Sequence, residues 1–235
     1  MKHFQARREL LEAARQLSAS GLGAIGSTSG NVSRRVEGGL LITPTGVAYE
    51  CLKAADLVEL DVQGNPLPGQ LRPSSEWRFH TDIYRSRSEA QAIVHAHPRF
   101  ATALACLRQA IPAFHYMVAV AGGDSIRCAD YATFGSAELS RNALAALVQR
   151  RACLLANHGI IALGESLARA MNLAVEVENL AAQYCRALQV GAPVILDAAE
   201  MARVVEKFAT YGQQAELLID RGLRRSALRP KQRRR

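Results

Sequence analysis

The hydrophobic positions of this chain recur with two different periods. Apolar residues three or four positions apart, as at Leu10, Ala14 and Leu17, are typical of helices that bury one face. This pattern predicts helices over residues 5–20, 74–87, 98–107, 136–149, 166–190 and 197–220. Ser136 stands at the start of the fourth, where a hydroxyl group can cap the first turn.

Between the helices, short runs that are apolar throughout or alternate with polar residues predict strands. These runs are 32–35, 39–43, 55–61, 92–97, 111–117 and 152–156. Tight turns join several of them, so helical crossovers cannot connect all of the strands in parallel. The sequence therefore predicts an α/β fold with a mixed, mostly antiparallel central sheet and helices on both of its faces.

Three histidines are candidate metal ligands. His95 and His97 lie two positions apart at the end of an apolar run, so both side chains can point to one face of a strand and reach one ion. A catalytic zinc ion takes three protein ligands, and His158, which follows the run 152–156, is the obvious third. Taken alone, the pair favours a plainer interpretation, in which one histidine packs in the core and the other caps the helix after Pro98.

A carboxylate stands at the start of the predicted helix 74–87. Glu76 follows Ser74 and Ser75, and an acidic residue in a first helical turn is most simply a partner of the helix dipole. Trp77 and His80 of the same helix are expected to be packing residues.

Two polar loops are candidates for binding an anion. The loops 27–31 and 44–46 are rich in hydroxyl groups and glycine. Either loop alone is more often only a turn. Two such loops beside the start of a helix can form a cradle for a phosphate dianion, because backbone N–H groups and the helix dipole favour negative charge.

Several motifs, in order along the chain, resemble those of the class II (zinc-dependent) aldolases of the aldolase/adducin family. They are Gly30-Asn-Val-Ser33, Leu41-Ile-Thr-Pro-Thr-Gly46, Ser74-Ser-Glu-Trp-Arg-Phe-His80, His95-Ala-His97, His115-Tyr-Met117, Tyr131-Ala-Thr-Phe-Gly135 and Asn157-His-Gly159. These motifs extend over nearly all of residues 5–215 and are most like those of the bacterial enzymes that act on L-fuculose 1-phosphate. The resemblance implies a three-layer α/β/α domain over residues 1–220.

The resemblance also implies roles for the polar candidate residues. His95, His97 and His158 hold one Zn²⁺, or another divalent ion, per subunit. Glu76 is the catalytic base and a further metal ligand when the site is empty. The phosphate contacts fall on Gly30, Asn31, Thr45, Gly46, Ser74 and Ser75.

Aromatic residues are implied on the aldehyde side of the site. Tyr116 is the acid that protonates the alkoxide oxygen of the departing aldehyde. Phe134 shapes the pocket, and Tyr211 closes over the aldehyde. For each tyrosine, a place in the core is the alternative. The family forms homotetramers with sites between subunits, so the resemblance implies the same assembly here.

The implied reaction is the reversible cleavage of a ketose 1-phosphate such as L-fuculose 1-phosphate. The products are dihydroxyacetone phosphate and an aldehyde of the L-lactaldehyde type, formed through a metal-stabilised enediolate.

Alternatives within the family are a 5-deoxyribulose-1-phosphate aldolase, a pentulose-phosphate 4-epimerase, a 3-oxo-tetronate-phosphate decarboxylase and a methylthioribulose-phosphate dehydratase. Asn157, where a histidine can occur, warns that the aldehyde specificity can differ. A non-catalytic, adducin-like interaction domain would not need the three histidines and the glutamate.

The net charge of +8 is confined to the end of the chain. Residues 221–235 hold eight of the 29 basic residues and no acidic residue, which leaves 21 basic and 21 acidic residues in 1–220. This predicts a basic, disordered C-terminal tail rather than a face that binds a specific nucleic acid.

No apolar run is long enough to cross a membrane. Five scattered cysteines without a CxxC pair favour a cytoplasmic protein with reduced thiols.

Overall fold

The computed structural model describes residues 2–22 and 29–210. Within these residues, seven strands form one sheet in the order β3-β2-β1-β4-β7-β6-β5. The strands are β1 (Asn31–Val36), β2 (Gly39–Ile42), β3 (Val58–Asp61), β4 (Ala92–Ala96), β5 (Cys128–Ala129), β6 (Ala152–Leu155) and β7 (Gly159–Gly164). All neighbouring pairs are antiparallel except β5 and β6, which confirms the predicted mixed, mostly antiparallel sheet.

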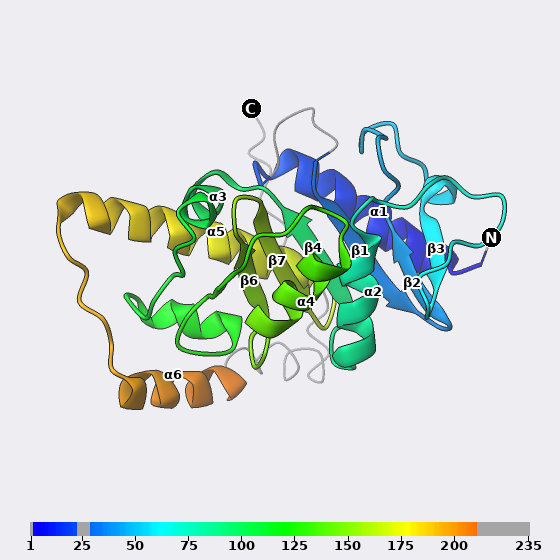
Figure 1. Cartoon of the computed structure of the whole chain (residues 1–235). Helices are drawn as coiled ribbons and strands as arrows, with labels where there is room; N and C mark the ends of the chain where they lie inside the picture. Colours follow the sequence, from blue (N-terminus) through cyan, green and yellow to red (C-terminus); the bar gives the residue numbers. More distant parts are fainter. Residues whose placement is uncertain (1, 23–28, 211–235) are drawn as a thin grey trace, which may run out of the picture.

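Helices cover both faces of the sheet, as Figure 1 shows. The described helices are α1 (Phe4–Ala19), α2 (Trp77–Ser86), α3 (Arg99–Cys106), α4 (Ala137–Ala146), α5 (Leu167–Val190), α6 (Ala198–Thr210) and the 3-10 helices η1 (Ala54–Asp56) and η2 (Tyr116–Ala121). Helices α1, α3 and α5 contribute to one hydrophobic core, and α2 and α4 to the other. The three-layer α/β/α prediction is confirmed.

Strand β4 lies at the centre of the sheet, between β1 and β7. Its residues Val94 and Ala96 pack into the core beside α1, α3 and α5, whereas Ile93 packs into the core beside α2 and α4. Because β4 is buried on both faces, its first three residues, 92–94, are apolar without alternation.

Two predicted strands differ from the observed elements. In the stretch 111–117, only Ile111 pairs, in a single bridge with Ile126, and η2 begins at Tyr116. Pro112 lacks the N–H group that a ladder needs, which makes a strand there unfavourable. In the stretch 55–61, the first residues belong to η1 and the strand begins only at Val58.

Two strands and the ends of two helices also differ from the prediction. Strands β5 and β7 were not predicted at all. Helix α2 begins at Trp77 rather than Ser74, because the backbone first makes a turn in which the Trp77 N–H group donates to the carbonyl of Ser74. Helix α4 ends at Ala146 instead of Gln149.

The described helices include none that is long and apolar enough to span a membrane. The predicted tail at 221–235 and Tyr211 lie outside the described residues. The tail, and with it the division of the chain at residue 220, therefore stays a prediction.

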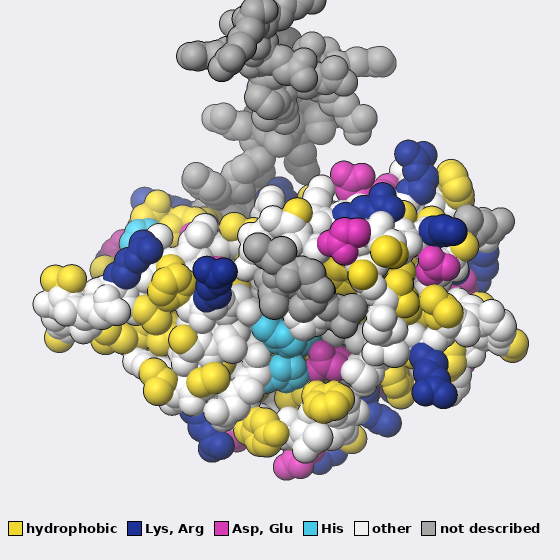
Figure 2. All heavy atoms as spheres, turned by 90° about the horizontal axis from the view of Figure 1, so that it is seen from above, with side chains coloured by type: hydrophobic (Ala, Val, Ile, Leu, Met, Phe, Trp, Pro, Cys, Tyr) yellow, Lys and Arg dark blue, Asp and Glu magenta, His cyan; other side chains and the backbone are white. Residues whose placement is uncertain are grey.

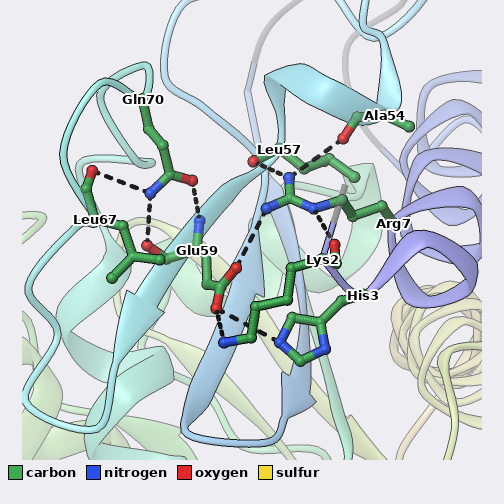
Figure 3. A network of polar contacts seen from close by, with 8 residues as sticks. All are labelled: Lys2, His3, Arg7, Ala54, Leu57, Glu59, Leu67 and Gln70. Carbon is green, nitrogen blue, oxygen red and sulfur yellow. Dashed lines mark hydrogen bonds and ion pairs between the residues drawn. The ribbon is translucent and has the colours of Figure 1, made fainter.

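A buried guanidinium group holds α1 against the edge of the sheet, as Figure 3 shows. Arg7 donates hydrogen bonds to the carbonyl oxygens of Leu57 (2.5 Å), Ala54 (3.3 Å) and Lys2 (3.1 Å). It also pairs with the Glu59 carboxylate at 3.4 Å, and the Lys2 ammonium group donates to the same carboxylate at 2.7 Å. Arg7 thus joins α1 to η1 and β3.

Removing this guanidinium group is expected to destabilise the fold without touching the candidate site. Arg7→Met should lower the free energy of unfolding by about 3 kcal/mol, because the buried Glu59 carboxylate loses one of its two cationic partners and the carbonyl groups lose their donor. Arg8→Met is the matched control, since Arg8 is exposed and should change stability by less than about 0.5 kcal/mol. Denaturant unfolding measures both. Equal stability of the two variants would contradict the anchoring role.

Candidate metal centre and active site

Four side chains converge where β4, β6, β7 and α2 meet. One ligand atom from each of Glu76, His95, His97 and His158 lies within 4.8 Å of the others. His95 Nε2 is 2.9 Å from Glu76 Oε2, and His158 Nε2 is 3.2 Å from Glu76 Oε1. The Nε2 atoms of His95 and His97 lie 2.9 Å apart. The three histidines and the glutamate predicted from the sequence are therefore brought together.

The sheet fixes the ring of His95. This histidine is fully buried in β4, and its Nδ1–H group donates to the carbonyl oxygen of Ile160 on β7, at 2.8 Å. Because the carbonyl can only accept, Nδ1 carries the proton and Nε2 faces the cluster. A second hydrogen bond of this kind is the usual way in which a metal-binding imidazole is oriented.

His158 lies in the tight connection between β6 and β7, whose last pair is Leu155 and Gly159. Asn157, beside His158, adopts a left-handed conformation with φ of 54°, which asparagine tolerates better than most residues. The backbone N–H group of Asn157 donates to the carbonyl of Ala105 at the end of α3, at 3.0 Å. The turn that carries His158 is thus held from two sides.

Gly159 is required by the close approach of β7 to the end of β4. A Cβ atom at this position would lie 2.3 Å from the carbonyl oxygen of Ala96 and 2.6 Å from Cδ2 of His97. Both distances are below any real contact of such an atom, so a larger residue would displace His97. The glycine of the Asn157-His158-Gly159 motif therefore makes room for a neighbouring ligand.

Glu76 does not serve the helix dipole in the way its position alone indicates. It is the N-cap residue of α2, but its side chain makes no capping hydrogen bond. Instead, its carboxylate points to the histidines and accepts a hydrogen bond from Asn31 Nδ2 at 3.0 Å. Its Oε1 atom is buried and accepts no hydrogen bond from any described residue. A carboxylate placed in this way is available to a cation or a substrate.

The charges in the cluster stabilise one another. Burial alone would raise the pKa of Glu76, but the charge and hydrogen bond of His95, with help from His158 and Asn31, hold it well below its usual range. Burial works against the charged form of His95, yet Glu76 raises the pKa of this histidine. Burial and the charge of His95 lower the pKa of His97 to about 3 and that of His158 to about 4. Glu76 is thus ionised, and the imidazoles of His97 and His158 are neutral.

A cavity of about 320 Å³ opens in front of the cluster. Figure 2 shows histidine and acidic side chains together in a hollow near the middle of one face. The cavity is lined by Ser29, Gly30, Asn31, Pro44, Thr45, Ser74, Ser75, Glu76, His97, Tyr131, Ala132, Phe134, Asn157 and His158. Five of the six predicted phosphate contacts line it, and Gly46 does not.

Short backbone contacts bring the two polar segments at this cavity together. The Ser74 N–H group donates to the carbonyl of Thr43 at 3.0 Å, and the Thr45 N–H group donates to the carbonyl of Arg72 at 3.2 Å. An antiparallel bridge joins Pro44 and Pro73 between them. The loop after β2 and the turn before α2 therefore form one wall of the cavity. The loop 27–31 lies only in part within the described residues.

The predicted aromatic residues fall in different places. Phe134 lies on the wall of the cavity and is 64% exposed. Tyr116 is absent from this wall and instead lines a second cavity beside η2 and α6, where its ring stacks on that of Phe208. Tyr116 is 52% exposed, so the alternative of a core tyrosine does not describe it. Within one chain, Tyr116 and Glu76 thus belong to separate cavities.

Two residues near the candidate site have roles that sequence reasoning missed. Tyr131 lines the cavity with 52% of its surface exposed; the motif Tyr131-Ala-Thr-Phe-Gly135 contains it, but no role was predicted for it from the sequence. His80 is fully buried, as expected of a packing residue, but both of its ring nitrogens are hydrogen-bonded. Trp77, the other residue of α2 expected to be a packing residue, packs against Gly64, where a Cβ atom would lie 2.1 Å from the indole ring.

Comparisons with known proteins agree with this site. The family model described as the class II aldolase and adducin N-terminal domain matches residues 8–185. The 5-methylthioribulose-1-phosphate/5-deoxyribulose-1-phosphate aldolase of Rhodospirillum rubrum is 56% identical over 90% of this chain and 94% of its own. L-fuculose phosphate aldolase of Escherichia coli is 46% identical over 92% of this chain and 100% of its own. A solved structure of L-fuculose 1-phosphate aldolase, 43% identical, matches with a TM-score of 0.84 over 89% of this chain and 98% of that one. The chain therefore belongs to the class II aldolase/adducin family.

Proposed function

We propose that this protein is an aldolase that cleaves a 5-deoxypentulose 1-phosphate. The products would be dihydroxyacetone phosphate and a two-carbon aldehyde, which carries a methylthio group when the substrate is the 5-methylthio derivative. The observation that carries the aldolase chemistry is the cluster of Glu76 with three histidines at the wall of a cavity. The choice of sugar follows the more similar relative, at 56% identity against 46% for the L-fuculose enzyme. L-fuculose 1-phosphate is the second candidate.

The residues of the cluster fit a divalent metal ion, and we infer that it is zinc. Imidazole nitrogens with a carboxylate are the ligands of many catalytic zinc sites. His95, His97 and His158 would hold the ion, and Oε1 of Glu76, which accepts no hydrogen bond from the described residues, lies 3.2 Å from Nε2 of His158 in the same cluster. When bound, such an ion supplies a Lewis acid that stabilises negative charge on the carbonyl oxygen of the substrate.

Glu76 is proposed as the base. In the condensation direction, a base removes a proton from the hydroxymethyl carbon of dihydroxyacetone phosphate, and cleavage uses the same group in reverse. The ionised carboxylate of Glu76 meets this need because it lines the cavity and is held by Asn31. The phosphate would lie against Gly30, Asn31, Thr45, Ser74 and Ser75, with Gly46 following Thr45 in the same loop.

The aldehyde half is proposed to involve exposed aromatic side chains. Tyr131 and Phe134 at the cavity offer an apolar surface, which suits a methyl or methylthio group better than a hydroxylated carbon. Tyr116 is proposed as the acid for the aldehyde oxygen. Because Tyr116 lies away from Glu76 in one chain, it would act in the site of a neighbouring subunit of a homotetramer. A role for Tyr211 and a cytoplasmic location remain predictions.

Metal analysis tests the proposed ion. The purified protein should contain about one divalent ion, mainly zinc, per chain, as a site with three histidine ligands predicts. His95→Ala should lose this ion, because the buried ligand and its link to Ile160 are both removed. His115→Ala is the control, since His115 lies at the second cavity and should leave the metal content unchanged. Full metal content in His95→Ala would contradict the assignment.

A comparison of substrates tests the sugar. We expect kcat/KM for 5-deoxyribulose 1-phosphate to exceed that for L-fuculose 1-phosphate by about 10-fold or more, since one group in an apolar pocket is worth about 10–200-fold. Phe134→Ala should narrow this difference by lowering the rate with the 5-deoxy sugar. Preference for L-fuculose 1-phosphate would replace the proposed substrate by the second candidate and leave the aldolase chemistry intact.

Mixing two inactive variants tests the shared site. Glu76→Gln alone should lose about 10²–10⁴-fold in rate, the usual contribution of a positioned acid or base, and Tyr116→Phe should also be slow. If each site takes Glu76 from one subunit and Tyr116 from its neighbour, a 1:1 mixture unfolded and refolded together should regain about a quarter of the wild-type activity. The separately refolded variants are the control. A mixture no more active than the variants alone would place both residues in one subunit's site.

A further inference from the structure

A row of buried polar side chains leads from Glu76 into the core between β1 and α2. On β1, the alternate residues Asn31 and Ser33 contribute to this row. On α2, His80 and Tyr84 lie one helical turn apart and contribute to it from the other side. All four are buried, and Ser33 and His80 are fully so. Polar groups in this position call for an explanation, because apolar side chains would pack there without needing partners.

The row is a continuous chain of hydrogen bonds. Tyr84 OH lies 2.9 Å from Ser33 Oγ, which lies 2.7 Å from Nδ1 of His80. Nε2 of His80 contacts Oδ1 of Asn31 at 2.5 Å, and Nδ2 of Asn31 donates to Glu76 Oε2 at 3.0 Å. None of these four residues has a buried side-chain atom without a partner. Every link is thus made, which is the condition for a buried polar network to be rigid.

The charge of Glu76 determines which group donates and which accepts in every hydrogen bond of this row. An ionised carboxylate only accepts, so Asn31 must turn its NH₂ group toward Glu76 and its carbonyl oxygen toward His80. His80 must then carry its proton on Nε2, which leaves Nδ1 as an acceptor for the hydroxyl of Ser33. The opposite tautomer would turn the amide oxygen of Asn31 toward the carboxylate, where two acceptors would repel each other. Burial keeps the ring neutral, since it lowers the pKa of His80 to about 3.

The two carboxylate oxygens of Glu76 have different hydrogen-bond partners. Oε2 accepts a hydrogen bond from Nδ2 of Asn31 at 3.0 Å and lies 2.9 Å from Nε2 of His95. Oε1 accepts no hydrogen bond from the described residues and faces Nε2 of His158 at 3.2 Å. One oxygen is therefore anchored, and the other is left for the chemistry of the cavity.

We propose that His80 is a positioning residue for the catalytic base: through Asn31, it fixes the Glu76 carboxylate so that Oε2 stays anchored and Oε1 takes up the proton of the substrate. This proposal rests on the proposed role of Glu76. His80 does not line the substrate cavity and is not one of the candidate metal ligands, so its removal should slow proton transfer while the metal still binds. Ser33 and Tyr84 extend the same chain and hold the ring of His80.

Two substitutions of His80 separate this role from a structural one. His80→Phe keeps the volume and the stacking on Phe79 but removes the donor to Asn31. His80→Gln places an amide N–H group near the position of Nε2 and restores that donor. Tyr184→Phe is the matched control for stability, because it removes a buried hydroxyl that accepts from Gln109 on the other face of the sheet.

The informative assay is the exchange of the hydroxymethyl protons of dihydroxyacetone phosphate with deuterated water, followed by NMR. His80→Phe should exchange about 10–100-fold more slowly than wild type, as is usual when a supporting hydrogen bond behind an active-site group is lost. Metal content should stay within about 2-fold, because no candidate ligand is removed. His80→Gln should recover most of the rate, and Tyr184→Phe should match wild type even where its melting temperature falls.

Four results would overturn the proposal. They are an unchanged exchange rate in His80→Phe, no recovery in His80→Gln, a loss of metal parallel to the loss of rate, and wild-type exchange in Glu76→Gln. The assay needs no ketose. A wild-type enzyme that exchanges these protons but fails to cleave 5-deoxyribulose 1-phosphate would therefore refute the proposed sugar alone, and the comparison of the His80 variants would still decide this inference.

Discussion

The burial of one charged carboxylate among three imidazoles is the constraint on which the site depends. An isolated carboxylate would be costly at this depth, so the fold has to bring compensating groups within hydrogen-bond distance. Glu76 is compensated by His95 from β4 and by Asn31 from β1, which lie opposite each other in the sheet. The register of β1 against β4 therefore decides whether the charge is tolerated. A shift of β1 by one residue would turn Asn31 to the other face and away from Glu76.

The same convergence explains why small residues stand at fixed places around the site. Gly159 lets β7 approach the end of β4, and Gly30 lets the chain before β1 approach the carbonyl of His95, 2.8 Å from where a Cβ atom would lie. Gly30 also has φ of 85°, a conformation that L-residues with side chains rarely adopt. These glycines contribute space rather than chemistry. They allow ligands from separate strands to lie close enough to share one ion.

The sequence predicted what local patterns determine, and it failed where distant pairing decides. The spacing of His95 and His97 after an apolar run was sufficient to predict their common face, and His158 followed from a second run. Strand β7, which orients His95 through Ile160, was missed because a continuous apolar run of this length is ambiguous between strand and helix. The stretch 111–117 has strand-like residues but no neighbour to pair with beyond Ile111. The position of Tyr116 away from Glu76 has no local signal at all.

The polar row behind Glu76 was visible in the sequence as two stripes that had no evident connection. Glu76, His80 and Tyr84 repeat at the four-residue spacing of a helix face, and Asn31 and Ser33 repeat at the two-residue spacing of a strand. Each stripe alone indicates only a polar face, which is normally exposed. Once β1 and α2 pack together, the stripes meet inside the core and must satisfy each other, because unpaired polar groups there would destabilise the fold. A core face that could have been filled with apolar side chains instead carries a directed series of hydrogen-bond donors that ends on the carboxylate of Glu76. The packing of β1 against α2 and the orientation of Glu76 are therefore one structural problem with one solution.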